Sequence, residues 1–129
     1  MLISVVIPAF DEEDYLGPTL ASLNGAAALL REKKGVSTEI IVVDNDSSDS
    51  TGAVAREFGA RVVSETVHNI AKVRNTGAAA AVGDVLVFVD ADTTVPAELL
   101  WRVFDAASGP GCLGGAADTD YRPSKLASK

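Results

Sequence analysis

The chain has 129 residues, 47% of them apolar and 22% charged, a composition that fits one folded domain and excludes a disordered chain. Its formal net charge of −7 excludes nucleic acid as the main partner, because a phosphate backbone is bound by a basic surface. No apolar run approaches the roughly 20 residues that cross a bilayer, and the single cysteine, Cys112, can form no disulfide within the chain. We therefore expect one cytoplasmic domain over residues 1–129 without a transmembrane segment.

Short apolar runs rich in β-branched residues alternate with segments of helical spacing along the chain. The predicted strands are Ile3–Ile7, Glu39–Val43, Arg61–Ser64 and Asp84–Val89. The predicted helices are residues 15–30, residues 50–58 ended by Gly59, Ile70–Val82 ended by Gly83, and Pro96–Phe104. This alternation predicts the α/β class, with a mostly parallel, doubly wound sheet covered by helices on both faces. A further strand is predicted to begin within Cys112–Tyr121.

Acidic side chains follow three of the predicted strands at the point where each strand ends. Residues 11–14 follow the first strand, residues 44–49 follow the second, and residues 90–92 follow the fourth. In a parallel α/β sheet, ligands bind beyond the carboxyl ends of the strands, where the strand order reverses. We therefore expect the three acidic clusters to share one edge of the sheet.

Asp90 and Asp92 form an Asp-x-Asp pair directly after the fourth predicted strand. In extended chain, residues two apart project to the same side with Cα atoms about 6–7 Å apart. Two carboxylates at about 6 Å repel by roughly 3 kcal/mol at an effective dielectric of 20, and a hard divalent cation removes this repulsion. The alternative is a solvated loop in which Asp92 caps the helix near Pro96.

Three further segments contain polar residues that can contact a ligand, have a structural role, or do either. Asp44 lies at the end of the second predicted strand, where an aspartate can accept hydrogen bonds from a base or a ribose. Asp46 to Ser48 can form an ordinary Asx turn. Asp49 and Ser50 are assigned to capping the following helix. Arg74 can bind phosphate through its guanidinium fork or form a surface ion pair. Glu12 and its neighbour suit the positive end of the first helix.

Four ordered segments together resemble the family 2 glycosyltransferases of the GT-A fold: "SVVIPAFDEEDYL", "EIIVVDNDSSDST", "AKVRNTGAAAAVGD" and "VLVFVDADT". The resemblance implies a nucleotide-diphospho-sugar transferase fold and a set of ligand contacts. The implied nucleotide contacts are Pro8, Ala9 and Phe10 lining the pocket, Asp44 on the uracil or other base, Arg74 on the base or diphosphate, and Asp90 on the ribose. Asp92, with Asp90, is implied to bind the Mn²⁺ or Mg²⁺ ion that bridges the diphosphate.

The resemblance also implies a reaction, the transfer of a sugar from a nucleotide-diphospho-sugar, of UDP type, to an acceptor hydroxyl. The implied enzyme is inverting and metal-dependent. Its general base is expected beyond Lys129, so that the acceptor half is absent and the domain is truncated on its C-terminal side. We accordingly expect self-association or a partner chain. Asn45-Asp46 replaces the family's usual Asp-Gly, Asp11 stands where asparagine is common, and Asn69 replaces a frequent glycine.

Two other classes of protein remain as alternatives. One is a non-catalytic nucleotide-sugar-binding or dimerising fragment. The other is a receiver-type signalling domain, which has a similar length and an acidic metal pocket. Against the receiver, Pro8 separates the first predicted strand from the acidic residues, and the third predicted strand ends at Ser64-Glu65. A Rossmann dehydrogenase is weaker still, because no Gly-x-Gly-x-x-Gly follows the first strand.

Overall fold

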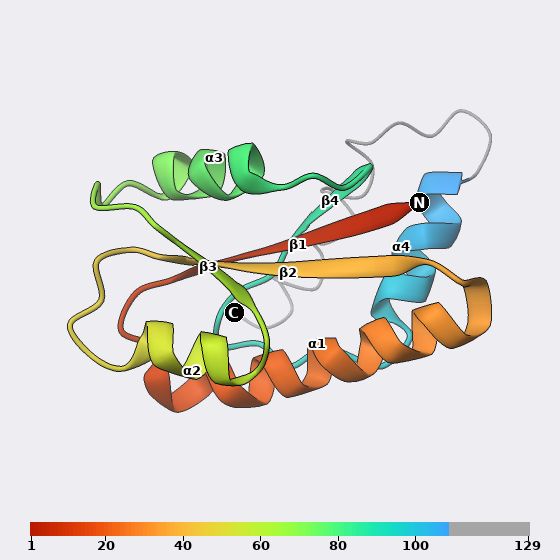
Figure 1. The fold of residues 1–129 in the computed structure, drawn as a ribbon, viewed down its shortest axis with the longest axis horizontal. Coiled ribbons are helices and arrows are strands. Elements are labelled where there is room, and N and C mark those ends of the chain that lie inside the picture. The colour runs from red at the N-terminus through yellow and green to blue at the C-terminus, as the bar shows by residue number, and fades with distance from the viewer. Residues whose placement is uncertain (109–129) are drawn as a thin grey trace.

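A computed structural model describes residues 1–108 of the chain. Strands and helices alternate along it (Figure 1): β1 (Leu2–Ala9), α1 (Glu13–Lys34), β2 (Ser37–Asp44), α2 (Thr51–Glu57), β3 (Arg61–Ser64), α3 (Ile70–Ala80), β4 (Val85–Phe88) and α4 (Leu99–Ser108). The strands form one parallel sheet in the order β3-β2-β1-β4. The predicted α/β class and parallel sheet are confirmed. The strand expected within Cys112–Tyr121 lies outside the described residues.

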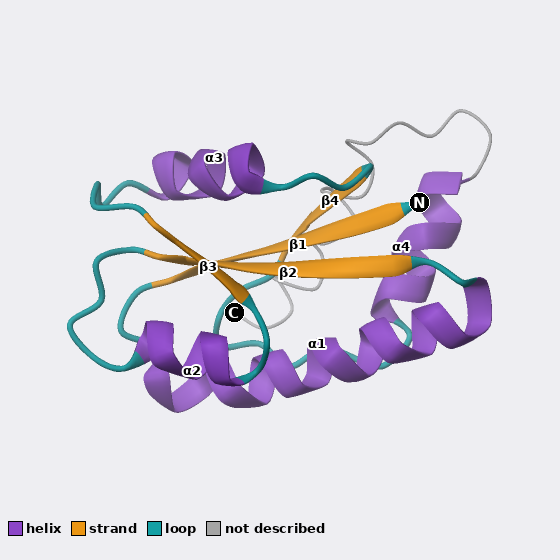
Figure 2. Cartoon of the chain, in the orientation of Figure 1, coloured by secondary structure: helices purple, strands orange, loops and turns teal. Residues whose placement is uncertain are grey.

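Helices cover both faces of the sheet, as a doubly wound fold requires (Figure 2). On one face α1, α2 and α4 pack against the sheet in a large apolar core that includes Leu16, Leu20, Leu23, Leu30, Ala55, Leu100 and Val103. On the other face α3 alone packs on a smaller cluster of Val6, Ile41, Val43 and Val73. Because β1 lies between β2 and β4 under both layers, its residues 3–7 are all fully buried, and apart from Ser4 they are apolar on both faces rather than alternating.

The chain after α3 leaves the helix earlier than the sequence predicts. The helix ends at Ala80 rather than Val82, because the Val82 N–H donates to Glu39 Oε2 at 2.7 Å and the Gly83 N–H donates to Ser4 Oγ at 2.8 Å. Gly83 is therefore no helix stop. A Cβ atom there would lie 2.8 Å from the Leu2 carbonyl oxygen, so glycine permits this close approach to β1.

Three other predicted details are also wrong. The fourth strand ends at Phe88 rather than Val89, and a turn follows in which the Thr93 N–H donates to the Asp90 carbonyl at 3.2 Å. The fourth helix begins at Leu99 rather than Pro96, whose carbonyl accepts a hydrogen bond from the Leu99 N–H. Ser50 occupies the N-cap of α2 but makes no side-chain capping bond there. Asp49 does cap, since its Oδ1 accepts from the Thr51 N–H at 2.9 Å.

The strand order distinguishes this fold from that of a receiver domain. In a receiver domain the first strand lies between the second and the third, whereas here β1 lies between β2 and β4. The order therefore excludes the receiver alternative. It also places the reversal of winding between β1 and β4, where ligands bind in such sheets. Among the described residues, no helix has both the length and the hydropathy to cross a membrane.

Candidate functional site

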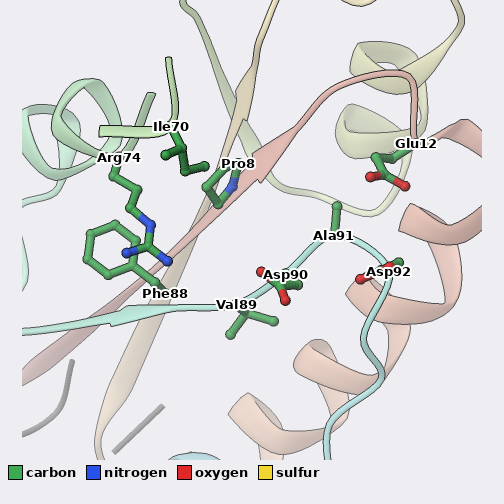
Figure 3. A pocket seen from close by; sticks show the side chains of 9 residues that line it. All are labelled: Pro8, Glu12, Ile70, Arg74, Phe88, Val89, Asp90, Ala91 and Asp92. Atoms are coloured by element: carbon green, nitrogen blue, oxygen red, sulfur yellow. The ribbon is translucent and has the colours of Figure 1, made fainter. Parts of the chain in front are cut away.

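Two adjoining cavities open at the carboxyl ends of β1 and β4, the point where the strand order reverses. The first, of about 130 Å³, is drawn in Figure 3 and is lined by Pro8, Glu12, Ile70, Arg74, Phe88, Val89, Asp90, Ala91 and Asp92. The second, of about 170 Å³, is lined by Pro8, Ala9, Phe10, Glu12, Asn45, Ile70 and Val73. They share Pro8, Glu12 and Ile70, and together they reach the lower end of the range for small-molecule sites, about 300 Å³.

The loop after β4 brings Asp90 and Asp92 into the first cavity. Ala91 between them is buried, and its carbonyl accepts a hydrogen bond from the Thr19 hydroxyl of α1 at 2.8 Å. Further along the loop, the Val95 N–H donates to Ser22 Oγ of the same helix at 3.0 Å. The longest helix thus fixes the backbone that carries both carboxylates, although the strand pairing stops at Phe88.

Arg74 reaches the same cavity from the opposite side, on α3. Its guanidinium lies 5.1 Å from the centre of the Phe88 ring, a cation–π contact that places it over the end of β4 (Figure 3). The N-terminus of α3 is capped by Asn69, whose side chain accepts from the Lys72 N–H at 3.0 Å. Asn69, which replaces a frequent glycine of the family, therefore starts the helix that positions Arg74.

The segment after β1 forms one wall of both cavities. Pro8 and Ala9 are the last residues of the strand, and Phe10 follows with half of its surface exposed. The Phe10 ring meets the His68 ring edge-on at 4.9 Å between centres. His68 Nε2 lies 3.8 Å from Asp46 Oδ2, so His68 links Phe10 to the loop that follows β2. The predicted pocket residues Pro8, Ala9 and Phe10 are thus brought together.

Asp44 lies outside the linings of these two cavities. Its Oδ1 accepts from the Ser47 N–H at 3.1 Å in an Asx turn, and a Cβ atom at Gly52 would lie 3.1 Å from its Oδ2. The carboxylate therefore faces the start of α2. The structure brings Asp90, Asp92 and Arg74 together in the lining of the first cavity. Asp44 contributes to neither cavity.

Two polar lining residues, Asn45 and Glu12, were not predicted as ligand contacts. Asn45 is 8% exposed and lines the second cavity directly after β2. Glu12 lines both cavities, although its place before the first helix suggested only a favourable contact with the helix end. The sequence did contain a signal for Asn45, because this asparagine replaces the family's usual aspartate. No local pattern distinguishes Glu12 from the acidic residues beside it.

The loops after β1 and β2 are fastened to each other. The Asp11 N–H donates to Ser47 Oγ at 2.9 Å, and Asp11 Oδ1 accepts from the Ser48 N–H at 2.8 Å. Asp11 has φ 51, a left-handed conformation that asparagine and aspartate tolerate better than most residues. The first two acidic clusters therefore share one edge of the sheet, as predicted, and support its loops.

Asp49 and Glu65 are ionised groups that hold this edge. Burial raises the pKa of Asp49, but hydrogen bonds from Thr51 and from the Glu13 N–H outweigh it, so the pKa lies below the ordinary value of 3.8. For Glu65 the hydrogen bond from the Thr76 hydroxyl is the main cause that lowers the pKa below 4.5, followed by the bond from the Val67 N–H. Both carboxylates thus bind their donors in the charged form.

The first cavity suits a divalent cation held jointly with a phosphate. Asp90 and Asp92 supply carboxylate oxygens, the ligands that Mg²⁺ and Mn²⁺ prefer. Within residues 1–108, no three His, Cys, Asp or Glu side chains converge to hold an ion by themselves. Protein carboxylates that take a metal together with substrate phosphates are the usual arrangement for Mg²⁺. The residues present therefore fit a metal that a diphosphate brings with it.

The fold and its strand order define the chain as an α/β domain of the GT-A type. A model of the family "Glycosyl transferase family 2" matches residues 4–125, and the chain belongs to that family. Glucosyl-3-phosphoglycerate synthase of Mycolicibacterium paratuberculosis is 35% identical over 119 residues, covering 84% of this chain and 34% of the relative. 4,4'-Diaponeurosporenoate glycosyltransferase of Staphylococcus haemolyticus is 39% identical over 100 residues, covering 70% and 24%.

Solved structures show the same fold. Glucosyl-3-phosphoglycerate synthase from Mycobacterium tuberculosis, in complex with Mn²⁺, UDP and glucosyl-3-phosphoglycerate, superposes with a TM-score of 0.69 at 31% identity, covering 84% of this chain and 40% of that one. A mannosyltransferase from Pyrobaculum calidifontis, in complex with GDP-Man and Mn²⁺, gives 0.72 at 25% identity, covering 84% and 32%. The chain thus spans between a quarter and two fifths of the length of these relatives.

Proposed function

We propose that this chain forms the nucleotide-diphospho-sugar-binding part of an inverting, metal-dependent glycosyltransferase. The observation that carries the proposal is the first cavity, where Asp90 and Asp92 face Arg74 at the switch point of a GT-A sheet. Two carboxylates can hold a metal and an arginine can bind phosphate oxygens, so the cavity combines the groups that a metal–diphosphate needs. The Mn²⁺ and UDP or GDP-Man in the related structures support the same reading.

The roles of the residues follow from their positions in the cavities. Asp92 and Asp90 would bind Mn²⁺ or Mg²⁺, with Asp90 also in reach of the ribose, and Arg74 would neutralise charge on the diphosphate. The metal, when bound, stabilises the negative charge that develops on the leaving diphosphate. Pro8, Ala9 and Phe10 would line the nucleotide pocket. The general base that deprotonates the acceptor hydroxyl is proposed to lie beyond Lys129, as the resemblance implies.

Calorimetric titration with UDP, with and without Mn²⁺, tests this proposal. We expect binding in the presence of Mn²⁺ and much weaker binding after chelation, because Asp92 reaches the diphosphate through the ion. Equal affinities in the two conditions would contradict the metal role. A parallel screen of UDP-, GDP- and dTDP-sugars identifies which nucleotide the sugar donor carries.

The chain spans at most about two fifths of the length of these relatives, so nucleotide binding and sugar transfer are proposed and tested separately. The alternative is a fragment that binds the nucleotide sugar or dimerises without catalysis. A transfer assay with generic acceptors separates the two. Self-association, or pairing with a chain that carries the acceptor half, also stays a prediction, as does the cytoplasmic location. Sedimentation at micromolar concentration tests the association.

A further inference from the structure

Asp90 and Asp92 are the first and third residues of a tight turn. The Thr93 N–H donates to the Asp90 carbonyl at 3.2 Å, the hydrogen bond between first and fourth residues that is typical of a β-turn. Ala91 is the second residue, so the peptide bond between Ala91 and Asp92 is the central peptide of the turn (Figure 3). The orientation of this peptide sets ψ of Ala91 and φ of Asp92. It therefore sets how the two carboxylates are directed relative to each other.

Thr19 of α1 holds this central peptide in one orientation. Its hydroxyl donates to the Ala91 carbonyl at 2.8 Å, and the two residues are only 0% and 3% exposed. The hydroxyl also lies 3.1 Å from the Tyr15 carbonyl, one turn earlier on the helix. A hydroxyl has one proton to donate, and the Tyr15 carbonyl can accept from a helix N–H instead. The loop carbonyl is thus the partner that depends on Thr19.

The central peptide of a β-turn has two common orientations, related by a rotation of roughly 150–170°. One of them requires a positive φ at the third residue, which suits glycine rather than aspartate. Within residues 1–108 the non-glycine residues with positive φ are Asp11 and Asp46, so Asp92 has the other orientation. A flip would take the Ala91 carbonyl away from Thr19 and give Asp92 a different φ. It would therefore redirect the carboxylate of Asp92.

A second anchor holds the far end of the same loop to α1. The Val95 N–H donates to Ser22 Oγ at 3.0 Å, and the Ser22 hydroxyl donates to the Thr19 carbonyl at 2.8 Å. Thr19 and Ser22 lie three positions apart and so are neighbours on the helix surface. Residues 91–95 are therefore fastened at two points to one helix, although the strand pairing of β4 stops at Phe88.

We infer that Thr19 is a positioning residue of the metal–diphosphate site: its hydroxyl holds the Ala91 carbonyl and so keeps the carboxylates of Asp90 and Asp92 directed toward one shared cation. This inference rests on the proposed function. Without the hydroxyl the buried carbonyl loses its donor, which is costly, and the turn has to flip or shift to find another. Thr19 lies outside the linings of both cavities, so it acts through the loop rather than on the ligand.

The same helix is attached to the wall on the β1 side of the site. Glu12 lines both cavities, and its carbonyl accepts the hydrogen bond of the Leu16 N–H at 2.9 Å in the first turn of α1. Thr19 follows Glu12 by seven residues, about two helical turns. The helix thus carries the Glu12 wall at its start and anchors the aspartate loop two turns later. Thr19 therefore positions the two carboxylates relative to this wall as well as to each other.

Thr19→Val tests the hydroxyl, because valine keeps the branched shape of threonine and has no O–H. In calorimetric titrations with UDP and Mn²⁺ we expect about tenfold weaker binding, the lower end of what the loss of an outer partner of a metal site costs. The affinity for UDP with chelator, which does not depend on the metal, should stay as in wild type. Thr19→Ser keeps the hydroxyl and should bind UDP with Mn²⁺ as wild type does. If valine prevents folding, Thr19→Ala carries the same prediction.

The matched control is Leu30→Ala on the same helix. Leu30 is fully buried about three turns after Thr19 and lies outside the linings of both cavities. This variant should lower the melting temperature and keep the Mn²⁺ dependence of UDP binding. A tenfold loss of affinity with Mn²⁺ in Leu30→Ala would show that lower stability alone weakens the site. The same loss in Thr19→Ser would show that the hydroxyl is not the cause, and either result would overturn the inference.

Wild type in the same titrations separates failure of this inference from failure of the proposed function. If wild type binds UDP more tightly with Mn²⁺ than with chelator and folded Thr19→Val keeps the same ratio, the positioning role of Thr19 is wrong while the metal–diphosphate site stands. If wild type has equal affinities in the two conditions, the proposed metal role is wrong, and the inference about Thr19 falls with it.

Discussion

At the scale of single residues, two adjacent side chains at the end of β2 have different surroundings. Successive residues of a strand face opposite sides, so Asp44 faces the start of α2 while Asn45 faces the cavity beside α3. Asp44 holds the turn through the Ser47 N–H, and Asn45 is held in turn by Glu65 and Val67. Two adjacent residues thus have different roles: Asp44 supports the loop, whereas Asn45 lines the second cavity.

Asp44→Ala distinguishes these roles for the predicted base contact. If Asp44 accepts from the base, the variant loses about 1.5–3 kcal/mol of UDP binding, the range for a hydrogen bond to a charged group, and keeps its affinity for pyrophosphate. If Asp44 only holds the Asx turn, the loss appears with both ligands or as a lower melting temperature without either. Calorimetry with UDP and pyrophosphate, beside a thermal melt, reads the difference.

Asp92→Asn tests the metal contact at the same scale. Asp92 is exposed at the edge of the sheet, so the substitution should leave the fold and its melting temperature unchanged. We expect it to remove most of the Mn²⁺ dependence of UDP binding, because an amide oxygen carries no charge for a hard cation. A variant whose UDP affinity still falls on chelation as in wild type would contradict the role of Asp92.

At the scale of elements, α3 lies unusually close to the sheet. A Cβ atom at Gly77 would lie 2.3 Å from Val6 Cγ1 and 2.9 Å from Val43 Cγ2, so the helix can pack there only with glycine. This approach sets the position of Arg74, one turn earlier on the same helix. The alanines that follow Gly77 continue the small-residue surface of the helix.

Gly77→Ala should therefore destabilise the domain by about 1–3 kcal/mol, the cost of overpacking a well-filled core. The matched control is Gly25→Ala in α1, where an added Cβ meets nothing within 4 Å. That variant should be stabilised by about 0.4–1 kcal/mol, because alanine loses less conformational entropy in a helix. Urea unfolding of both variants measures the two opposite shifts. Stabilisation by Gly77→Ala would show that the helix moves freely on the sheet.

The β3–α3 segment gives a pH dependence of known sign. The pKa of Glu65 is lowered in the folded protein, chiefly by the hydrogen bond from Thr76, so its contribution to stability is complete above the ordinary value of 4.5. It is lost as the pH falls from there through the lower folded pKa. Wild type should therefore lose more unfolding free energy between pH 6 and 3 than Glu65→Gln does. Parallel pH profiles of the two proteins would contradict this.

At the scale of the whole molecule, the ligand should stabilise the fold. The proposed site draws on β1, the loop after β4 and α3, so the unfolded chain cannot form it. A ligand that binds only the folded state adds about 2.7 kcal/mol at a concentration one hundred times its Kd. We expect UDP with Mn²⁺ to raise the melting temperature, and UDP with chelator to raise it much less. Thermal melts across a UDP series check this, with Mn²⁺ alone as the control.

The sequence by itself determined the class and layering of the domain. The alternation of apolar runs with helical segments predicted the parallel sheet, because strands buried on both faces are mostly apolar, as residues 3–7 of β1 are apart from Ser4. It also placed Pro8, Asp90 and Asp92 at one edge, since residues at the carboxyl ends of parallel strands necessarily meet there. Four ordered motifs identified the family that the family model confirms.

Only the tertiary structure decided which of the neighbouring polar residues, Asp44 or Asn45, lines the second cavity. Asn45 enters the second cavity because carbonyls from the segment after β3, twenty and more positions along the chain, hold its amide. The helix limits at Ala80 and Leu99 likewise depend on distant partners, such as Ser4 and Glu39, rather than on local propensity. Local sequence determines periodicity, whereas the direction of a side chain at a loop is set by hydrogen bonds that exist only after the sheet has assembled.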